Sequence, residues 1–182
     1  MAKERCTEEV HRLDPNMRKY DWTYYNELLP YVKGEVLDIG CGAGMFAKEY
    51  AKKPEVTSVL GIDKYVEEMP TDVDKITCQQ FDIPDELGYS EDSAKFDTIV
   101  STEFVEHIPR EKLEPLLDFV RNSLKDGGLF IGSTPNKKVP TTNPYHLYEY
   151  TLTELLSIYR GFFSEVEAYD NGQNCTVWIA KK

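Results

Sequence analysis

The chain has 182 residues, a length that suits one domain with a hydrophobic core and excludes two domains of ordinary size. Hydrophobic and charged fractions of 41% and 29% are typical of a soluble globular protein, and no apolar run is long enough to span a membrane. The formal net charge of −11 disfavours nucleic acid as a partner, because binding to phosphates normally needs a basic surface. Four scattered cysteines and a polar start predict reduced thiols, no signal peptide and a cytoplasmic location.

Residues 1–34 are predicted to form an N-terminal arm and a helix. The apolar residues of this helix recur at helical spacing on one face: Trp22, Tyr25, Leu28 and Leu29. This pattern predicts a helix that packs against the edge of a sheet. In a second interpretation, Tyr20 or Tyr24 folds over a bound ligand as a lid.

The stretch from Val36 to Phe46 contains the clearest motif of the chain. A short apolar run predicts a buried strand, which ends in three glycines spaced one residue apart and continues into a helix over 45–53. Glycine accepts positive φ and lets the backbone approach a ligand closely, so this order predicts a binding site. Asp38, near the end of the strand, would face the ligand. Met45 stands where a dinucleotide fingerprint requires its third glycine.

Three further predicted strands also end in polar residues. They cover residues 59–62, 76–83 and 96–101. Ligands of parallel α/β sheets bind over the carboxyl ends of the strands, where Asp63 could accept bonds from both hydroxyls of a ribose. Asp82 lies at the end of the third strand, with Asp85 as a competitor, and Ser101 ends the fourth.

The second half of the chain completes the predicted sheet. Apolar residues from Leu113 to Leu124 predict an amphipathic helix, and a strand follows over 129–134. The loop over 135–150 is long enough to be functional. Thr151 and Glu154 form a capping box for the next helix, and strands over 162–169 and 175–180 are joined by an Asn-Gly turn. The predicted fold class is α/β: one domain over 1–182 with a Rossmann-like doubly wound sheet, mostly parallel, with an antiparallel C-terminal edge strand.

The order acidic-x-Gly-x-Gly-x-Gly, followed by polar groups at three more strand ends, resembles class I S-adenosylmethionine-dependent methyltransferases. The resemblance extends from about Val36 to Ile179 and implies S-adenosylmethionine as the cofactor. The residues implied to bind it are Asp38, Gly40, Gly42 and Gly44 at the methionine part, Asp63 at the ribose, Asp82 and Ile83 at the adenine, and Ser101 and Glu103 beside the sulfonium.

The acceptor side is predicted from two places in the chain. A helix that begins at about Thr102 would put Glu103, Glu106 and His107 on one face, and His146 lies in the loop over 135–150. Two carboxylates and two imidazoles suit a divalent cation. These four residues resemble the metal-binding motif of HEN-type RNA 2′-O-methyltransferases. Glu-His pairs at this position also occur in small-molecule O-methyltransferases, including those of ubiquinone biosynthesis.

The favoured hypothesis is methyl transfer to the hydroxyl of a small-molecule or saccharide-like acceptor, with His107 and His146 as catalytic residues. One alternative is metal-dependent 2′-O-methylation of an RNA 3′ end, with Glu103, Glu106, His107 and His146 as ligands. Another is a non-catalytic module that binds the cofactor and serves a partner. In a purely structural interpretation, Glu106 is a solvated helix residue and His107 bonds the backbone near Pro109. The acceptor, the pathway and the oligomeric state are not indicated by the sequence.

Overall fold

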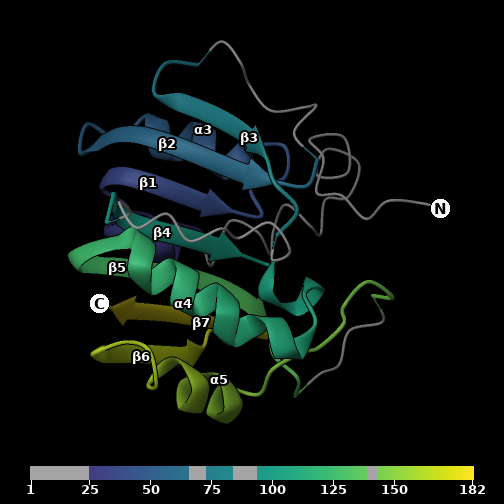
Figure 1. Ribbon diagram of the computed structural model, residues 1–182. Helices are drawn as coiled ribbons and strands as arrows, with labels where there is room; N and C mark the ends of the chain where they lie inside the picture. Colours follow the sequence, from purple (N-terminus) through teal and green to yellow (C-terminus); the bar gives the residue numbers. More distant parts are fainter. Residues whose placement is uncertain (1–24, 66–72, 84–93, 139–142) are drawn as a thin grey trace.

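A seven-stranded sheet forms the centre of the computed structural model, which describes residues 25–65, 73–83, 94–138 and 143–182 (Figure 1). Its strands are β1 (Gly34–Ile39), β2 (Val56–Asp63), β3 (Ile76–Gln80), β4 (Phe96–Thr102), β5 (Leu124–Pro135), β6 (Glu165–Asp170) and β7 (Cys175–Lys181). The helices are α3 (Met45–Ala51), α4 (Leu113–Ser123) and α5 (Leu152–Tyr159), with short 3-10 turns η1 (Leu29–Tyr31), η2 (Val105–His107) and η3 (Arg110–Lys112).

The strand order is β3-β2-β1-β4-β5-β7-β6, and the first five strands of the chain are parallel. β7 runs antiparallel to both β5 and β6, so the antiparallel pairs lie at one edge of the sheet. The chain order reverses between β1 and β4, and in open α/β sheets ligands bind at the carboxyl ends beside such a reversal. The predicted Rossmann-like fold class is confirmed.

Helices cover both faces of the sheet, with α4 and α5 on one side and α3 on the other (Figure 1). β1 is buried on both faces: Val36 packs into the cluster under α3, and Leu37 packs into the cluster under α4 and α5. The cluster under α4 and α5 is built around large aromatic side chains. The ring centroids of Phe130 and Tyr159 lie 5.6 and 5.4 Å from the centroid of Trp178. A fully buried aromatic side chain contributes about 2–3 kcal/mol through the area that it removes from water, so this cluster is a main source of stability.

The helix predicted before β1 is helical at residues 25–28 and continues into η1. Tyr25 and Leu28 are buried, and the Tyr25 ring stacks on Phe46 and Tyr50 of α3, with centroids 4.7 and 5.9 Å away. The predicted helix is confirmed for these residues. It packs on α3 and into the cluster that contains Val36 of the central strand β1, whereas the prediction placed it at the edge of the sheet. Tyr20, Trp22 and Tyr24 lie outside the described residues, so the lid stays a prediction.

Two local predictions in the C-terminal half are confirmed. Thr151 caps α5: its hydroxyl accepts from the Glu154 amide at 3.2 Å, while the Glu154 carboxylate accepts from the Thr151 amide at 2.9 Å. The turn between β6 and β7 contains Asn171 and Gly172, and the Asn171 amide donates to the Cys175 carbonyl at 3.0 Å.

Candidate active site

The glycine turn after β1 has the backbone conformation that its sequence predicts. Gly40, Gly42 and Gly44 have φ values of 73°, 53° and 69°, a region that other residues enter only with strain. A side chain at Gly40 would collide with Phe104, because an added Cβ would lie 2.3 Å from that ring. The Gly40 amide also donates to the Ile62 carbonyl at 2.9 Å, which holds the turn over the end of β2.

Asp63 ends β2 and fastens this turn. One carboxylate oxygen accepts from the Gly42 amide and the other from the Tyr65 amide, both at 2.9 Å. A carboxylate has about four acceptor positions, so two are engaged here and the group keeps capacity for hydroxyl donors. The ribose contact implied by the resemblance stays a prediction, and the structural role of Asp63 is an addition to it.

Asp38 is a buried carboxyl group behind the glycine turn. It is 2% exposed, and its pKa is raised to about 7, first by burial and second by the nearby charge of Asp63. Burial disfavours the charged form, so this carboxyl is about half protonated at neutral pH. A cation placed beside it would favour the carboxylate.

The residues predicted at the adenine follow β3 and those predicted at the sulfonium lie at the end of β4, two strands that β2 and β1 separate in the sheet. Asp82 follows β3, and its carboxylate accepts from the Lys64 ammonium at 2.6 Å. Ile83 is 9% exposed and packs into the core cluster under α4. Ser101 in β4 is fully buried, and its hydroxyl has no hydrogen-bond partner among the described residues. Asp85, the competitor of Asp82, lies outside them.

The helix predicted to begin at Thr102 is wrong. β4 continues through Thr102, which pairs with Ser133 of β5, and Glu103 then turns the chain with a positive φ of 49°. Glu103 therefore shares no helical face with Glu106 and His107. Its carboxylate instead accepts from the Ser133 hydroxyl at 2.9 Å and from the Cys175 thiol at 3.4 Å. Pairing with β5 keeps the chain extended one residue longer than its sequence indicates.

Three of the four predicted metal ligands nevertheless lie together. One ligand atom each from Glu106, His107 and His146 lies within 4.8 Å of the others, and the two imidazole rings meet edge to face with centroids 4.9 Å apart. The Glu106 side chain is fully buried, with one oxygen accepting from the Thr134 hydroxyl at 2.9 Å and the other 3.7 Å from Nε2 of His107. The interpretation of Glu106 as a solvated residue is wrong.

The segment around His146 is attached to η2 by its backbone. The amides of Leu147 and Tyr148 both donate to the Glu106 carbonyl, at 2.7 and 3.2 Å. The His107 ring contacts the Tyr145 carbonyl through Nδ1 at 3.2 Å. These contacts bring His146 to His107 across 39 positions of sequence, a proximity that the motif resemblance implies and that periodicity alone does not predict.

One residue of this segment was not predicted. The Glu149 carboxylate lies 2.8 Å from Nδ1 of His146, and both side chains are about one tenth exposed. The spacing of three residues is a weak signal for such a pair, because it occurs often in loops and helices alike. The neighbours Tyr145 and Leu147 are 39% and 59% exposed, so apolar side chains border this histidine.

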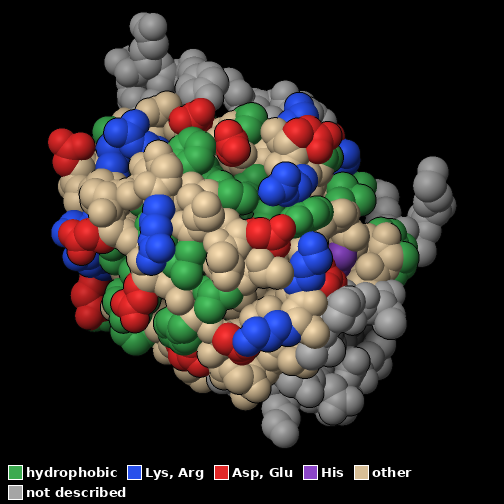
Figure 2. Space-filling view, turned by 90° about the horizontal axis from the view of Figure 1, so that it is seen from below, with side chains coloured by type: hydrophobic (Ala, Val, Ile, Leu, Met, Phe, Trp, Pro, Cys, Tyr) green, Lys and Arg blue, Asp and Glu red, His purple; other side chains and the backbone are tan. Residues whose placement is uncertain are grey.

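Basic side chains also border the cluster. The Arg110 guanidinium and the Lys137 ammonium lie 5.2 and 4.7 Å from the centroid of the Tyr148 ring. In Figure 2 a histidine lies at the surface beside basic and acidic side chains. The surface at the predicted acceptor side is thus locally of mixed charge in a chain whose overall charge is strongly negative.

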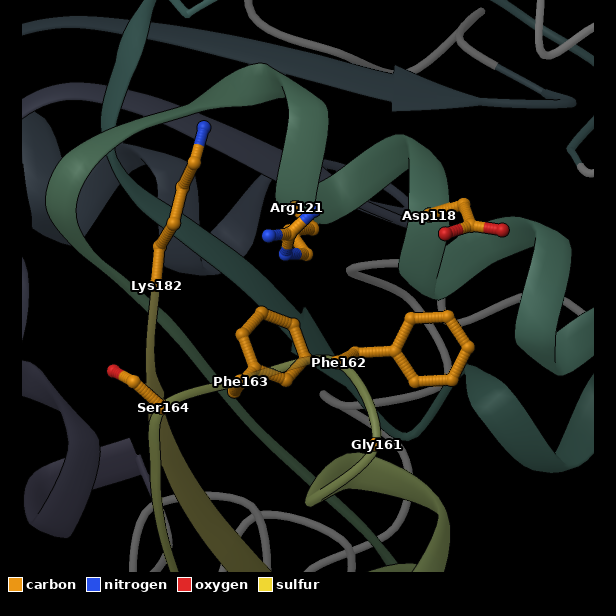
Figure 3. A pocket seen from close by; sticks show the side chains of 7 residues that line it. All are labelled: Asp118, Arg121, Gly161, Phe162, Phe163, Ser164 and Lys182. Carbon is orange, nitrogen blue, oxygen red and sulfur yellow. The ribbon is translucent and has the colours of Figure 1, made fainter.

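A separate surface hollow contains none of the predicted site residues (Figure 3). It is lined by Asp118, Arg121, Gly161, Phe162, Phe163, Ser164 and Lys182. Lys182 bonds the carbonyls of Leu124 and Gly128 at the start of β5, so the hollow lies towards the amino ends of the parallel strands. Ligand sites of this architecture lie at the opposite ends.

Solved structures with this fold define its class. DhpI in complex with SAH superposes with a TM-score of 0.76 at 16% identity, covering 94% of this chain and 88% of that one. A SAM-dependent methyltransferase from Archaeoglobus fulgidus gives 0.75 at 20% identity, covering 96% and 97%. The N-methyltransferase NodS from Bradyrhizobium japonicum WM9 gives 0.71 at 18% identity, covering 97% and 93%. The fold is therefore the Rossmann-like fold of class I methyltransferases.

The chain belongs to the methyltransferase domain family, whose model matches residues 3–170. It is 30% identical to a ubiquinone biosynthesis O-methyltransferase of Histophilus somni over 142 residues. This matched region covers 70% of this chain and 55% of that protein. A second such protein, from Acinetobacter baumannii strain AYE, is 31% identical over 111 residues, 57% of this chain and 44% of its own length. The chain thus spans about half the length of the curated relatives it matches. Among the described residues, no helix has the length and apolar character of a membrane span.

Proposed function

We propose that this chain transfers a methyl group from S-adenosylmethionine to a hydroxyl group of a small-molecule acceptor. The observation that carries this proposal is the contact between Phe104 and the glycine turn at Gly40. Phe104 follows Glu103 directly in the chain and comes two residues before Glu106. The proposed donor side, at the ends of β1 and β2, and the proposed acceptor side, after β4, are therefore immediate neighbours.

The residues at the ends of β1 and β2 fit the cofactor. The turn at Gly40, Gly42 and Gly44 leaves backbone where side chains would otherwise project, and Asp63 retains acceptor capacity for ribose hydroxyls. Asp38 offers a buried carboxyl to the cationic part of the ligand. When bound, S-adenosylmethionine supplies a methyl group that its sulfonium already activates. The chain then has to orient the acceptor and accept a proton from it.

His107 and His146 are the proposed proton acceptors. Their rings lie edge to face beside the partly exposed Tyr145 and Leu147, an arrangement suited to a small acceptor with an apolar part. The relatives named as ubiquinone biosynthesis O-methyltransferases support a hydroxyl acceptor of this kind. A positioned general base contributes about 100-fold to 10,000-fold to a rate.

The proposal is tested by labelled methyl transfer. The protein is incubated with methyl-labelled S-adenosylmethionine and fractionated small-molecule acceptors, and binding of S-adenosylhomocysteine is measured separately by calorimetry. We expect His146→Ala and His107→Ala to lose about 100-fold or more in transfer rate while binding the cofactor product normally. The control is His11→Ala, at a position outside the described residues. No cofactor binding would overturn the proposal, and binding without transfer to any fraction would favour a non-catalytic module.

A second candidate function adds a divalent cation at Glu106, His107 and His146. The convergence of one carboxylate and two imidazoles within 4.8 Å supports it, and this donor set fits a transition metal. A cation held there would polarise the acceptor hydroxyl and favour loss of its proton. The RNA 3′ end is the alternative acceptor, which the net charge of −11 disfavours.

Metal analysis separates the two candidates. Protein purified without chelator is analysed for bound metal, and Mn²⁺ binding is titrated by calorimetry. The metal-dependent mechanism predicts that His146→Ala and Glu106→Gln each weaken Mn²⁺ binding, and that transfer requires the cation. Transfer at full rate in excess chelator would contradict it. A small RNA with and without a 2′-O-methyl group at its 3′ end serves as the acceptor control.

A further inference from the structure

The contact between Glu149 and His146 determines which imidazole nitrogen carries the proton. An ionised carboxylate can only accept hydrogen bonds, so its contact with Nδ1 at 2.8 Å requires a hydrogen on that nitrogen. In the neutral ring the lone pair is then on Nε2. Both side chains are about one tenth exposed, which limits competition by water for this contact.

His107 shows the same arrangement with a different acceptor. Its Nδ1 lies 3.2 Å from the Tyr145 carbonyl, which can only accept, and its Nε2 lies 3.7 Å from a Glu106 oxygen. Both rings of the cluster therefore have Nδ1 directed towards the segment over 145–149. In each neutral ring with its proton on Nδ1, the lone pair is on Nε2.

We propose that Glu149 is a positioning residue that holds His146 in the tautomer protonated at Nδ1 and directs its Nε2 to the acceptor site. The role of His146 in methyl transfer rests on the proposed function, whereas the tautomer does not. Glu149 acts through His146 and is not itself assigned a contact with the acceptor.

The proposal explains why a carboxylate stands at this position. A carboxylate behind an imidazole fixes its orientation and makes the opposite nitrogen more basic, a pairing common at metal-bound and catalytic histidines. The Glu106 carbonyl accepts from the amides of Leu147 and Tyr148, so the backbone between His146 and Glu149 is already held. The carboxylate then restrains the side-chain torsions of His146, which backbone bonds leave free to rotate.

The chain allows a direct spectroscopic test because it has only three histidines. Long-range proton–nitrogen correlation spectra of ¹⁵N-histidine-labelled protein distinguish the two neutral tautomers and the doubly protonated ring. Spectra are recorded at about pH 8.5, well above the ordinary imidazole pKa of about 6.5. Assignment uses His11→Gln and His107→Asn. We expect His146 to be a single tautomer with the proton on Nδ1. A proton on Nε2, or on both nitrogens, would overturn the proposal in the unmodified protein.

Two variants test the role of the carboxylate. Glu149→Gln should produce a mixture of His146 tautomers, because an amide can donate or accept, and Glu149→Asp should restore part of the wild-type signature. Glu114→Gln, an exposed substitution on α4, is the matched control. If Glu149→Gln retains folding and the pure Nδ1 tautomer, the proposal fails.

A functional readout accompanies the spectra. We expect Glu149→Gln to weaken Mn²⁺ binding, or to lower the transfer rate where no metal is used, by about 10-fold to 100-fold. An unchanged tautomer overturns the assignment of Glu149 whether or not methyl transfer occurs. A changed tautomer in a protein that binds no cofactor overturns the proposed function alone.

Discussion

At the scale of single residues, Asp38 is a carboxyl group whose pKa burial shifts into the neutral range. Its pKa of about 7 in the folded chain lies above the ordinary value of 3.8, with burial as the first cause. Between these two values the folded state binds more protons than the unfolded state. The free energy of unfolding of the ligand-free protein should therefore fall as the pH rises from about 4 to about 7, by up to about 1.4 kcal/mol per pH unit.

Cofactor binding should reverse the protonation of Asp38. S-adenosylmethionine carries an ammonium and a sulfonium group, and a cation beside the carboxyl favours its ionised form. Binding at about pH 6 should therefore release close to one proton per site, and the affinity should rise with pH up to about 7. Calorimetry in two buffers with different enthalpies of ionisation measures this proton. We expect Asp38→Asn to remove the release, and an equal release in the variant would assign it to another group.

At the scale of elements, local chemistry was predictable and long-range pairing was not. The capping box at Thr151 and the turn at Gly172 follow from a few adjacent residues, so both were found from the sequence. The end of β4 depends on pairing with β5, and the positive φ of Glu103 has no signature in the residues around it. The prediction that Glu103, Glu106 and His107 share one helical face was wrong for this reason.

The cap of α5 should contribute measurably to stability. Thr151→Ala removes the hydroxyl that accepts from the Glu154 amide and should cost about 1 kcal/mol in urea denaturation, whereas Thr151→Ser should cost less than half as much. Bonds from the Thr151 amide, the Tyr148 hydroxyl and the Thr151 hydroxyl lower the Glu154 pKa from 4.5 to about 2. Its contribution is present above about pH 4.5 and should be lost as the pH falls through 2. Equal stability of the Ala and Ser variants would contradict the cap.

Two glycines test how closely the central strands pack. An added Cβ at Gly132 in β5 would lie 1.9 Å from the Ser101 carbonyl and 2.3 Å from Trp178, whereas one at Gly127 meets nothing within 4 Å. Gly132→Ala should therefore destabilise the chain by about 3 kcal/mol or more, since the colliding atom is backbone. Gly127→Ala should cost only about 1–2 kcal/mol, the strain of a left-handed residue. Chemical denaturation of both variants measures the contrast, and equal losses would contradict it.

At the scale of the whole molecule, the sheet order decides which residues become neighbours. Hydrophobic periodicity and strand-end residues were enough to predict the fold, because each strand of a parallel sheet delivers its last residue to the same edge. The proposed donor side follows from this rule, since Asp38 and Asp63 lie near the ends of the neighbouring strands β1 and β2. On the proposed acceptor side, the resemblance to a metal-binding motif implied that His146 joins Glu106 and His107, and these three side chains lie together. The attachment of the segment over 143–150 to the Glu106 carbonyl has no sequence motif. This is why Glu149 emerged only from the structure.

Ligand binding at that edge should stabilise the whole chain. S-adenosylhomocysteine at about 100 times its dissociation constant adds about 2.7 kcal/mol to the free energy of unfolding. For a chain of this size, that corresponds to a rise in Tm of about 5–11 °C in calorimetry.

The Asp63→Ala variant shows whether this stabilisation arises at the proposed site. The substitution removes the acceptor of the Gly42 and Tyr65 amides, so it lowers the Tm of the ligand-free protein as well. The informative quantity is therefore the ligand-induced rise in Tm, which should nearly vanish in Asp63→Ala. The control is Asp118→Ala, an exposed substitution in the hollow at the opposite ends of the strands, where the rise should stay unchanged. A full rise in Asp63→Ala would place the ligand elsewhere, because binding would then not depend on this carboxylate.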